Sequence, residues 1–555
     1  MYQQQHSNKR LVAFLAFWLG CWGIMWSFDP LVYQQIRQQV SNGDVDAGML
    51  RLEKQIKKEK KEAQWYWLLD DIYKSQRLTT QRIECLQRAL KEKKLTQRNA
   101  TIIRLAQAFF DNGNYDKAQA LYHTLPASLP KEKWIKGCHI ADSLRKHPIA
   151  VTLQSMGDSI NMPYDNIWPS LTADAQWFCS TVVLGKRGFV GNTMQLQEDI
   201  YISKKVNGVW QPIEALSYPI NTESNEGSQS FSADGNYLFL ARCNEQGGMG
   251  SCDIYYCIKR NNKWSAPILA PAPLNSKYWE STPALSASGK EMYFSSNRPG
   301  GKGGKDIWQC KVTQQKDGRL FFSSPVPISD AINTSGDELS PFLHTNDSTL
   351  YFVSNGHYGM GGLDIFCSKR QKNGTWSTPQ NMGYPINTYG DEMGWFVSPN
   401  GETAYLSSDH QQQDAIHKII YRIELPENMR PTPAKPMQIW QIGTPYQLEN
   451  IYFDFNKATL NDASYTELNH LVATMKTHPQ LRFTISGHTD NVGNEAYNLQ
   501  LSQQRADSVV HYLIQHGVEP SRLQSQGMGS SRPIESNQTE WGRAQNRRIE
   551  ISLWQ

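Results

Sequence analysis

Cysteine is the first residue type in this chain whose spacing could do chemistry, as a metal ligand, a nucleophile or a disulfide partner. The sequence has nine cysteines, none in a CxxC pair, and no Cys/His cluster has zinc-ligand spacing, so we expect no metal or other cofactor. Cys243 and Cys252 flank the loop in RCNEQGGMGSCDI. An oxidising compartment would allow a disulfide between them, with two unpaired core thiols as the alternative.

Acidic and aromatic residues recur through the middle of the chain, where they could be catalytic or architectural. Asp-Ile followed by an aromatic residue occurs at Asp199, Asp253, Asp306 and Asp364. A residue that recurs once per repeat usually holds the geometry of that repeat. No arginine cluster for a carboxylate substrate accompanies these turns. We therefore predict that the chain is not an enzyme and has no catalytic residues.

Near the C-terminal end, His488 and Asp490 have a spacing that could suggest acid–base or metal chemistry. No third partner lies close in the sequence, so a structural histidine is the favoured interpretation. Asn498 precedes Arg505 by two helical turns, so both side chains project from one helix face. An apolar stripe beside that face is expected to pack on a sheet, and it consists of Leu499, Ala506, Val510 and Leu513.

The elements that must position these residues begin with an export signal over residues 1–28. A lysine-arginine pair precedes an uncharged apolar run over residues 11–28. This run is short for a spanning helix, which needs roughly 20 residues. Its Leu-Gly-Cys resembles the end of a bacterial lipobox, although Trp18 stands where that motif usually has Leu. We expect lipid on Cys21, with an uncleaved signal anchor as the second interpretation and cleavage to a soluble form as the third.

Residues 36–147 lack strand alternation and read as helices broken at Gly and Pro. The segment IIRLAQAFFDNGNYDKAQALYHTLPA resembles a tetratricopeptide (TPR) helix pair, with a Gly-Asn turn between small and aromatic packing positions. We infer a TPR-like helical domain of about two or three pairs. An ordinary helical bundle would pack the same residues without a binding groove and is the alternative.

A repeat of about 50 residues dominates residues 150–425. Each copy ends in two alternating apolar runs around a tight turn, as at Asp234-Gly235 and Asn400-Gly401, where glycine permits positive φ. A single small sheet leaves both faces wet, so such sheets are expected to stack radially as a propeller. Five hairpins predict five blades, or six if the first and last strands are shared. The repeats resemble the TolB-type, WD-like propeller family.

Five prolines in residues 426–445 predict a semi-rigid linker. Strand and helix patterns then alternate over residues 446–555. The expected elements are a strand over 451–455, a helix over 462–478, a strand over 482–486, a helix over 494–516 and a final strand in RRIEISL.

Four segments of this last region, FDFNKATL, ISGHTDNVGNEAYNLQLSQQRADSV, SQGMGSSRPIESN and NRRIEI, resemble the successive motifs of the OmpA-like peptidoglycan-binding domain. The resemblance implies an α+β fold that holds the diaminopimelate of the peptidoglycan stem peptide, which carries ammonium and carboxylate groups. An acceptor-only anion beside a forked cation suits such a ligand.

By motif, Asp490 would bind the ammonium and Arg505 the carboxylate. Both are expected at a pocket rim, where Asn498, Thr489, Asp454 and Arg548 are further candidates. In the alternative interpretation, Asp490 only caps the following helix and Arg505 makes a surface ion pair.

The expected fold class is multidomain, with N-terminal α-helical TPR-like repeats, an all-β propeller of five or six blades and a C-terminal α+β OmpA-like domain. This order resembles PorE-type components of the Bacteroidetes type IX secretion machinery. In that family a small β-sandwich separates propeller and OmpA-like domain, whereas here only the linker lies between them.

The predicted function is a periplasmic scaffold, preferably an outer-membrane lipoprotein, that binds peptidoglycan and envelope proteins, secretion-system components among them. Net charge is +4, and no basic stripe interleaved with aromatics suggests nucleic acid. Two rival hypotheses are a wall-tethered propeller hydrolase and an outer-membrane barrel. The barrel would need many strands of roughly ten residues with a lipid-facing side.

Overall fold

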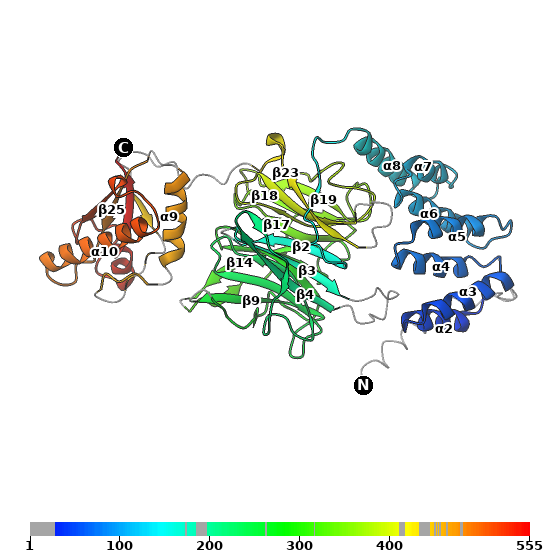
Figure 1. Ribbon diagram of the computed structural model, residues 1–555, viewed down its shortest axis with the longest axis horizontal. Helices are drawn as coiled ribbons and strands as arrows, with labels where there is room; N and C mark the ends of the chain where they lie inside the picture. Colours follow the sequence, from blue (N-terminus) through cyan, green and yellow to red (C-terminus); the bar gives the residue numbers. More distant parts are fainter. Residues whose placement is uncertain are drawn as a thin grey trace. The chain divides into compact units, whose positions relative to one another are not determined.

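The computed structural model describes residues 28–554 apart from 173–174, 185–196, 261–262, 316, 410–416, 432–444, 449–450, 452, 454–456, 462–463 and 478–480. A helical region, a β-rich region and a mixed α/β domain follow one another along the chain (Figure 1). Cys21 and most of the predicted linker lie outside the described residues. No helix in the described part combines the length and the apolar composition that a membrane crossing requires.

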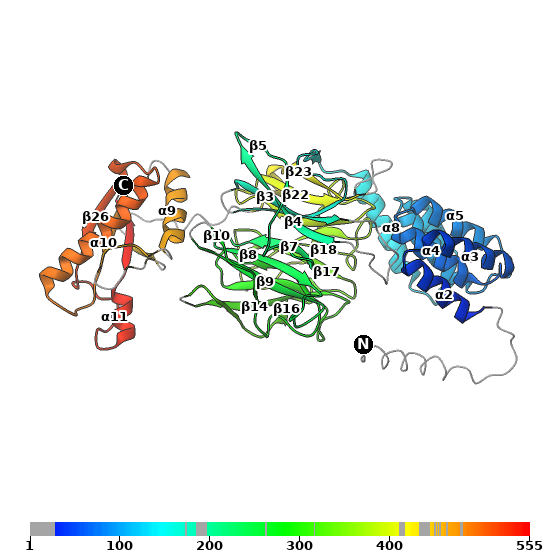
Figure 2. The same ribbon diagram turned by 60° about the horizontal axis from the view of Figure 1, so that its bottom comes forward.

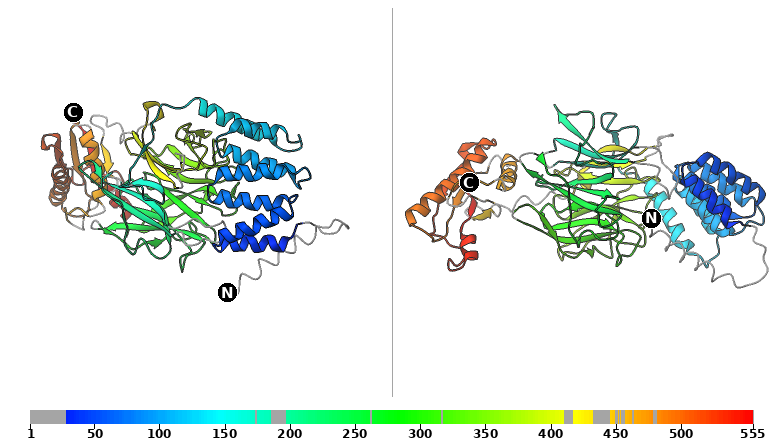
Figure 3. Two further views of the ribbon diagram at one scale, coloured as in Figure 1. Left: turned by 45° about the vertical axis from the view of Figure 1, so that its right-hand side comes forward. Right: turned by 90° about the horizontal axis from the view of Figure 1, so that it is seen from below.

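The N-terminal region is a row of helices in which each of α2 to α6 packs on the next (Figure 3). The helices are α2 (Pro30–Ser41), α3 (Val45–Lys58), α4 (Ala63–Ser75), α5 (Thr79–Leu90), α6 (Arg98–Phe110), α7 (Tyr115–His123) and α8 (Lys131–Lys146). A Cβ at Gly48 would come 2.3 Å from Val40 Cγ2, so glycine permits the close approach of α3 to α2. Buried ion pairs join α4 to α5 and α6, because Asp70 contacts both Arg82 at 2.9 Å and Arg104 at 2.8 Å.

Among the described residues of the middle region, short strands form five antiparallel sheets (Figure 2). The sheets are β2-β3-β4-β5 with β6 on β4, β7-β8-β9-β10 with β11 on β9, β12-β13-β14-β15 with β16 on β14, β17-β18-β19-β20, and β21-β22-β23-β1. Their strands are β1 (Gln154–Ser155), β2 (Asp165–Leu171), β3 (Trp177–Leu184), β4 (Gln197–Val206), β5 (Val209–Trp210), β6 (Glu214–Ala215), β7 (Asn225–Phe231), β8 (Tyr237–Cys243), β9 (Cys252–Arg260), β10 (Lys263–Trp264), β11 (Ile268–Leu269), β12 (Glu280–Leu285), β13 (Glu291–Ser296), β14 (Asp306–Gln314), β15 (Leu320–Phe322), β16 (Val326–Pro327), β17 (Glu338–Leu343), β18 (Thr349–Ser354), β19 (Asp364–Lys369), β20 (Gln380–Asn381), β21 (Glu392–Val397), β22 (Thr403–Ser408) and β23 (Ile419–Glu424).

The first long strands of the five sheets contact one another in a closed order. β2 contacts β7, β7 contacts β12, β12 contacts β17, β17 contacts β21, and β21 contacts β2. The fifth sheet joins the two ends of the region, because β1 pairs with β23 in the register Gln154 to Arg422.

The recurring asparagines of the repeat act as backbone clamps between successive elements. Asn275 Oδ1 accepts from the Ile254 N–H at 2.8 Å, and its Nδ2 donates to the Ile254 carbonyl at 2.8 Å. Asn333 makes the same two contacts with Ile307. Each clamp stands in for a strand partner and satisfies two buried backbone groups.

Four glutamates that the sequence analysis did not single out lie at the first or second position of the first long strands β7, β12, β17 and β21. They are Glu226, Glu280, Glu338 and Glu392, and each is 0% exposed. Glu338 accepts from the Thr334 N–H at 2.7 Å, the Thr334 hydroxyl at 2.6 Å and the Ser354 hydroxyl at 2.7 Å. Burial raises the pKa of Glu392 well above its ordinary value, and the nearby Asp364 raises it further. The signal that could have found these residues is Asn-Ser/Thr-x-x-x-Glu, which occurs before four of the five first long strands.

Trp168 of β2 lies where the first strands meet. Its indole Nε1 donates to the Ser340 hydroxyl on β17 at 3.1 Å. A Cβ at Gly227 on β7 would come 3.1 Å from the Trp168 ring, and one at Gly394 on β21 would come 2.7 Å from the Trp168 Cα. Trp168 has φ +51°, a conformation that a bulky residue adopts only when its surroundings impose it. One residue thus contacts three other first strands.

Cys243 and Cys252 are register partners at adjoining ends of β8 and β9 and are bonded as a disulfide. We expect Cys243→Ser, Cys252→Ser or the double variant to lower the free energy of unfolding by roughly 2 to 3 kcal/mol at most, because only a short loop loses its closure. Thiol labelling of the unreduced, unfolded protein checks the bond. Modification of both cysteines without reductant would contradict it.

The C-terminal domain places helices against a four-stranded sheet of order β24-β27-β25-β26. Its elements are β24 (Tyr446–Leu448), α9 (Tyr465–Thr477), β25 (Phe483–Gly487), α10 (Glu495–Gln515), β26 (Leu523–Gly527), α11 (Glu540–Asn546) and β27 (Ile549–Leu553). β25 is parallel to β26 and antiparallel to β27. Most of the strand expected over 451–455 lies outside the described residues, and of those described Phe453 forms an isolated bridge with Leu460. β24 and β26 were not predicted.

The apolar stripe expected on α10 is shorter than the sequence indicated. Ala506 and Leu513 are fully buried, but Leu499 is 52% exposed. β26 ends at Gly527, and a Cβ there would come 2.8 Å from the Leu499 carbonyl oxygen. The end of the strand therefore meets the helix backbone and leaves the leucine side chain uncovered.

Candidate functional site

The loop after β25 carries the candidate residues His488, Thr489 and Asp490. A Cβ at Gly487 would come 2.1 Å from the Ser502 carbonyl oxygen, so glycine lets α10 lie directly on this strand. The His488 N–H donates to the Arg548 carbonyl at 3.0 Å, and the Thr489 N–H donates to that of Gly529 at 2.9 Å. The loop is thereby held on both sides.

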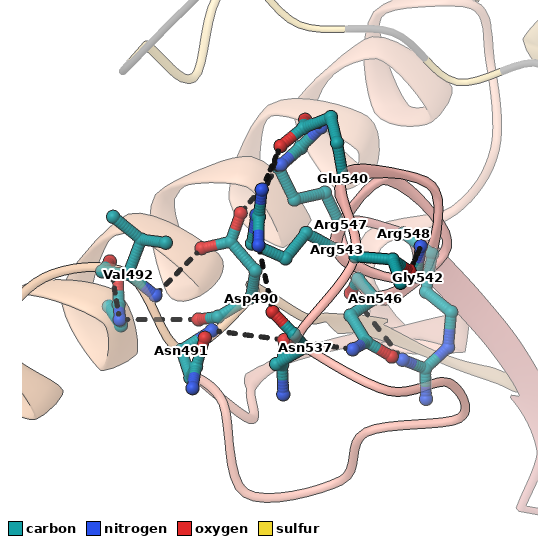
Figure 4. Close-up of polar contacts among 12 residues, drawn as sticks. Asp490, Asn491, Val492, Asn537, Glu540, Gly542, Arg543, Asn546, Arg547 and Arg548 are labelled. Carbon is teal, nitrogen blue, oxygen red and sulfur yellow. Dashed lines mark hydrogen bonds and ion pairs between the residues drawn. The ribbon is translucent and has the colours of Figure 1, made fainter.

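Asp490 is only 8% exposed, although we expected it at a pocket rim. Its Oδ1 accepts from the Val492 N–H at 3.0 Å, and its Oδ2 accepts from Arg547 Nη1 at 2.6 Å (Figure 4). It does not cap α10, because that position belongs to Asn494, whose side chain accepts from the Ala496 N–H at 2.8 Å. Asp490 therefore faces a cation.

Arg547 was not among the predicted site residues. Its second nitrogen, Nη2, lies 2.9 Å from Glu540 Oε1, so it bridges Asp490 and the exposed Glu540 (Figure 4). The neighbouring Arg548, which we did predict, is buried and turns to Glu550 at 2.7 Å and to the Arg532 carbonyl at 3.0 Å. The two adjacent arginines of NRRIEI thus have different partners.

His488 lies beneath the loop, with Nε2 at 3.1 Å from Glu550 Oε2. The contact with His488 lowers the pKa of Glu550 to about 2, with Arg548 acting in the same direction. The partner of His488 is therefore a distant residue in the sequence, on β27. This contact gives His488 a structural role beneath the loop that carries Asp490.

Arg505 on α10 is 8% exposed and so lies deeper than a rim residue. Its Nε donates to the Lys457 carbonyl at 3.1 Å, and the guanidinium carbon lies 5.0 Å from the centre of the Phe453 ring. Burial lowers the pKa of Arg505, the charge of Arg547 lowers it further, and Asp490 acts in the opposite direction. Among the described residues, no carboxylate forms an ion pair with Arg505.

The remaining candidates have different positions. Asn498 is buried and donates from Nδ2 to the carbonyls of Asp490 at 3.3 Å and Val492 at 3.2 Å, so it ties the loop to α10. The Thr489 hydroxyl is buried without a hydrogen-bond partner in the described structure. Asp454 lies outside the described residues. A group of three or more His, Cys, Asp or Glu side chains that could hold a metal is absent from the residues searched, which are the described ones.

This arrangement combines one carboxylate and two guanidinium groups from three segments, which are Asp490 on the loop after β25, Arg505 on α10 and Arg547 at the end of α11. A buried guanidinium costs free energy unless an anion matches it. Because its fork suits a carboxylate or phosphate, the site can bind an anion next to a cation-accepting group.

The sheet, the helices and this site define an OmpA-like domain. Residues 452–547 match the model of the OmpA family. The chain is 45% identical over 104 residues to probable lipoprotein YiaD of Escherichia coli (strain K12), covering 19% of this chain and 48% of that protein. It is 46% identical over 101 residues to peptidoglycan-binding protein ArfA of Mycobacterium tuberculosis (strain ATCC 25618 / H37Rv), covering 18% and 31%.

The chain spans about a third to a half of the length of the curated relatives it matches. Among solved structures, the peptidoglycan-associated lipoprotein from Burkholderia pseudomallei is similar at 33% identity and a TM-score of 0.18, covering 19% of this chain and 87% of that one.

Proposed function

We propose that this chain is an envelope scaffold that binds peptidoglycan through residues 446–555. The observation that carries the proposal is Arg505, a buried guanidinium with no carboxylate partner among the described residues and with Asp490 close by. The stem-peptide diaminopimelate has matching groups, a carboxylate for Arg505 and an ammonium for Asp490. The likeness to ArfA, whose name describes a peptidoglycan-binding protein, supports the same ligand.

In this proposal the ligand ammonium displaces Arg547 from Asp490. Arg547 keeps its second contact with Glu540, so its charge stays matched when the ligand enters. Asn498 shapes the loop and Arg548 supports it through Glu550. Thr489 and Asp454 are proposed to contact the ligand at the edge of the pocket.

For the rest of the chain we propose a five-bladed propeller and a TPR-like helical domain that bind envelope proteins, secretion-system components among them. The closed contact order of the five sheets and the pairing of β1 with β23 support the propeller. The helix pairs α4–α5 and α6–α7 support the helical repeat. We place the protein in the periplasm, tethered to the outer membrane by lipid on Cys21.

We also propose that the β-rich region has no catalytic activity. Its recurring asparagines and glutamates are occupied by backbone and hydroxyl groups. Trp168 also lies where the first long strands of the sheets meet, and its contacts there are with β7, β17 and β21.

Sedimentation of the full chain with purified peptidoglycan tests the wall-binding proposal. We expect the chain to pellet with the wall and to be released by a soluble tripeptide that ends in diaminopimelate. The same peptide with lysine in place of diaminopimelate is the control and should release much less, because it lacks the second carboxylate. Equal release by both peptides would contradict the assigned ligand.

A further inference from the structure

A second recess lies along α10, beyond the Arg505 end of the site. It is an open groove with a volume of about 480 Å³, and its lining includes Thr459, Leu460, Tyr465, Asp507, Ser508 and Tyr512. The rings of Tyr465 and Tyr512 stack on each other with centroids 5.1 Å apart, and the Tyr512 hydroxyl donates to Asn469 at 2.9 Å. The aromatic wall is therefore held in place before any ligand arrives.

This groove adjoins the proposed diaminopimelate site along α10. Arg505 and Tyr512 are seven residues apart on α10, so both lie on one stripe of the helix, about 10 Å apart along its axis. The same short segment borders both places, because Lys457 accepts the hydrogen bond from Arg505 while Ala458 to Leu460 line the groove.

The lining favours an uncharged, hydroxyl-rich ligand. Asp507 Oδ1 accepts hydrogen bonds from the Gln503 and Ser525 side chains, and Oδ2 can accept from a ligand hydroxyl or amide. No lysine or arginine lies among the described lining residues, whose ionisable acid–base side chains besides the tyrosines are Asp507 and His511, so the groove offers no guanidinium or ammonium group to the carboxylates of a stem peptide. A pyranose ring fits better, because its C–H face packs on an aromatic ring while its hydroxyls reach polar groups. The ring that can take this contact is Tyr465, since Tyr512 is stacked between Tyr465 and His516.

The distance also fits a sugar next to the stem. Diaminopimelate is the third residue of the stem, so two residues separate it from the glycan strand. Two extended residues span about 7 Å, and the lactyl group that joins the stem to the sugar adds the rest of the distance of about 10 Å along α10. The polymer that supplies diaminopimelate to Arg505 therefore carries an amino sugar at the position of the groove.

We infer that this groove is a subsite for an N-acetyl amino sugar of the glycan strand, adjoining the diaminopimelate site. The inference rests on the proposed function, since the stem peptide positions the sugar. In this arrangement Asp507 accepts from the sugar, and the tyrosine wall packs on its ring. The domain then binds both the diaminopimelate and the sugar to which the stem peptide is attached.

Calorimetric titration of the full chain with two soluble ligands tests the subsite. One is the diaminopimelate tripeptide, and the other is the same tripeptide on its N-acetylglucosamine–N-acetylmuramic acid disaccharide. We expect the disaccharide form to bind about tenfold tighter. Ser508→Trp fills the groove and should abolish this difference while the tripeptide affinity stays unchanged. Asp507→Ala, a milder second variant, should reduce the difference.

The matched control is Gln524→Trp. Gln524 is exposed on β26, and its neighbour Ser525, not Gln524 itself, contacts α10, so the added ring lies away from the groove. It should keep the full difference. Equal affinities of the two ligands for the wild-type chain, or a difference that persists in folded Ser508→Trp, would overturn the sugar subsite alone. Absence of binding by both ligands would overturn the proposed function and the subsite with it.

Discussion

Replacing Arg505 by alanine is expected to weaken binding of the chain to peptidoglycan by about thirtyfold or more. Removing one partner of a desolvated charge pair costs roughly 2 to 5 kcal/mol, and about 1.4 kcal/mol corresponds to tenfold in affinity. Arg505→Lys should bind almost as poorly, because a point charge cannot reproduce the fork of the guanidinium. The measurement is titration with the diaminopimelate tripeptide, together with sedimentation on purified peptidoglycan.

The reciprocal variant, Asp490→Ala, is expected to lose a similar amount. It leaves the ligand ammonium unmatched and also frees Arg547 from its 2.6 Å contact. Since Asp490 and Arg505 are both buried, circular dichroism and thermal unfolding must accompany each titration.

Arg522 provides a matched control for the loss of a buried arginine. It is 9% exposed, and its Nε donates to the Leu481 carbonyl at 2.9 Å, as Arg505 Nε does to that of Lys457. Arg522→Ala should therefore disturb packing to a similar degree without weakening wall binding. Folded Arg505 and Asp490 variants that pellet like the wild type would refute the assignment of both residues.

Replacing Trp168 by alanine is expected to destabilise the β-rich region by at most about 3 to 5 kcal/mol, the range for a fully buried aromatic side chain, because Trp168 is half-buried. Truncation of a large aromatic side chain removes its burial and leaves a cavity. Here the cavity would open between β2, β7, β17 and β21, and the hydrogen bond to Ser340 would be lost. Urea unfolding of the full chain measures the effect, and hydrogen exchange assigns the transition to these strands.

Trp177 is the matched control, because it lies at the start of β3 and its ring contacts Lys204 at 5.5 Å. Trp177→Ala should cost much less, since no other first strand of a sheet depends on it. If Trp168→Ala shifted the unfolding midpoint no more than Trp177→Ala, the central role of Trp168 would be wrong.

Local patterns predicted much of the secondary structure. The helix expected over 494–516 is α10, Glu495–Gln515, because its caps and apolar period are local features. β26, with the sequence LQSQG, was missed because its residues have little alternation and its stability comes from pairing with β25. Leu499 was misassigned for a related reason, since helical period alone does not tell where the opposing strand ends.

The ordered motifs of the last region predict by themselves that Asp490 and Arg505 belong to one site, and the match of residues 452–547 to the OmpA family supports the domain that contains both residues. Which arginine meets Asp490 was decided only by the tertiary structure. Arg547 is the C-cap of α11 and Arg548 lies between it and β27, so the turn from helix to strand brings one arginine to Asp490 and the other to Glu550. Asp490 and Arg547 are 57 residues apart in the chain. An ion pair between residues so far apart in the chain depends on how β25 and β27 pair, and local sequence patterns do not predict that pairing.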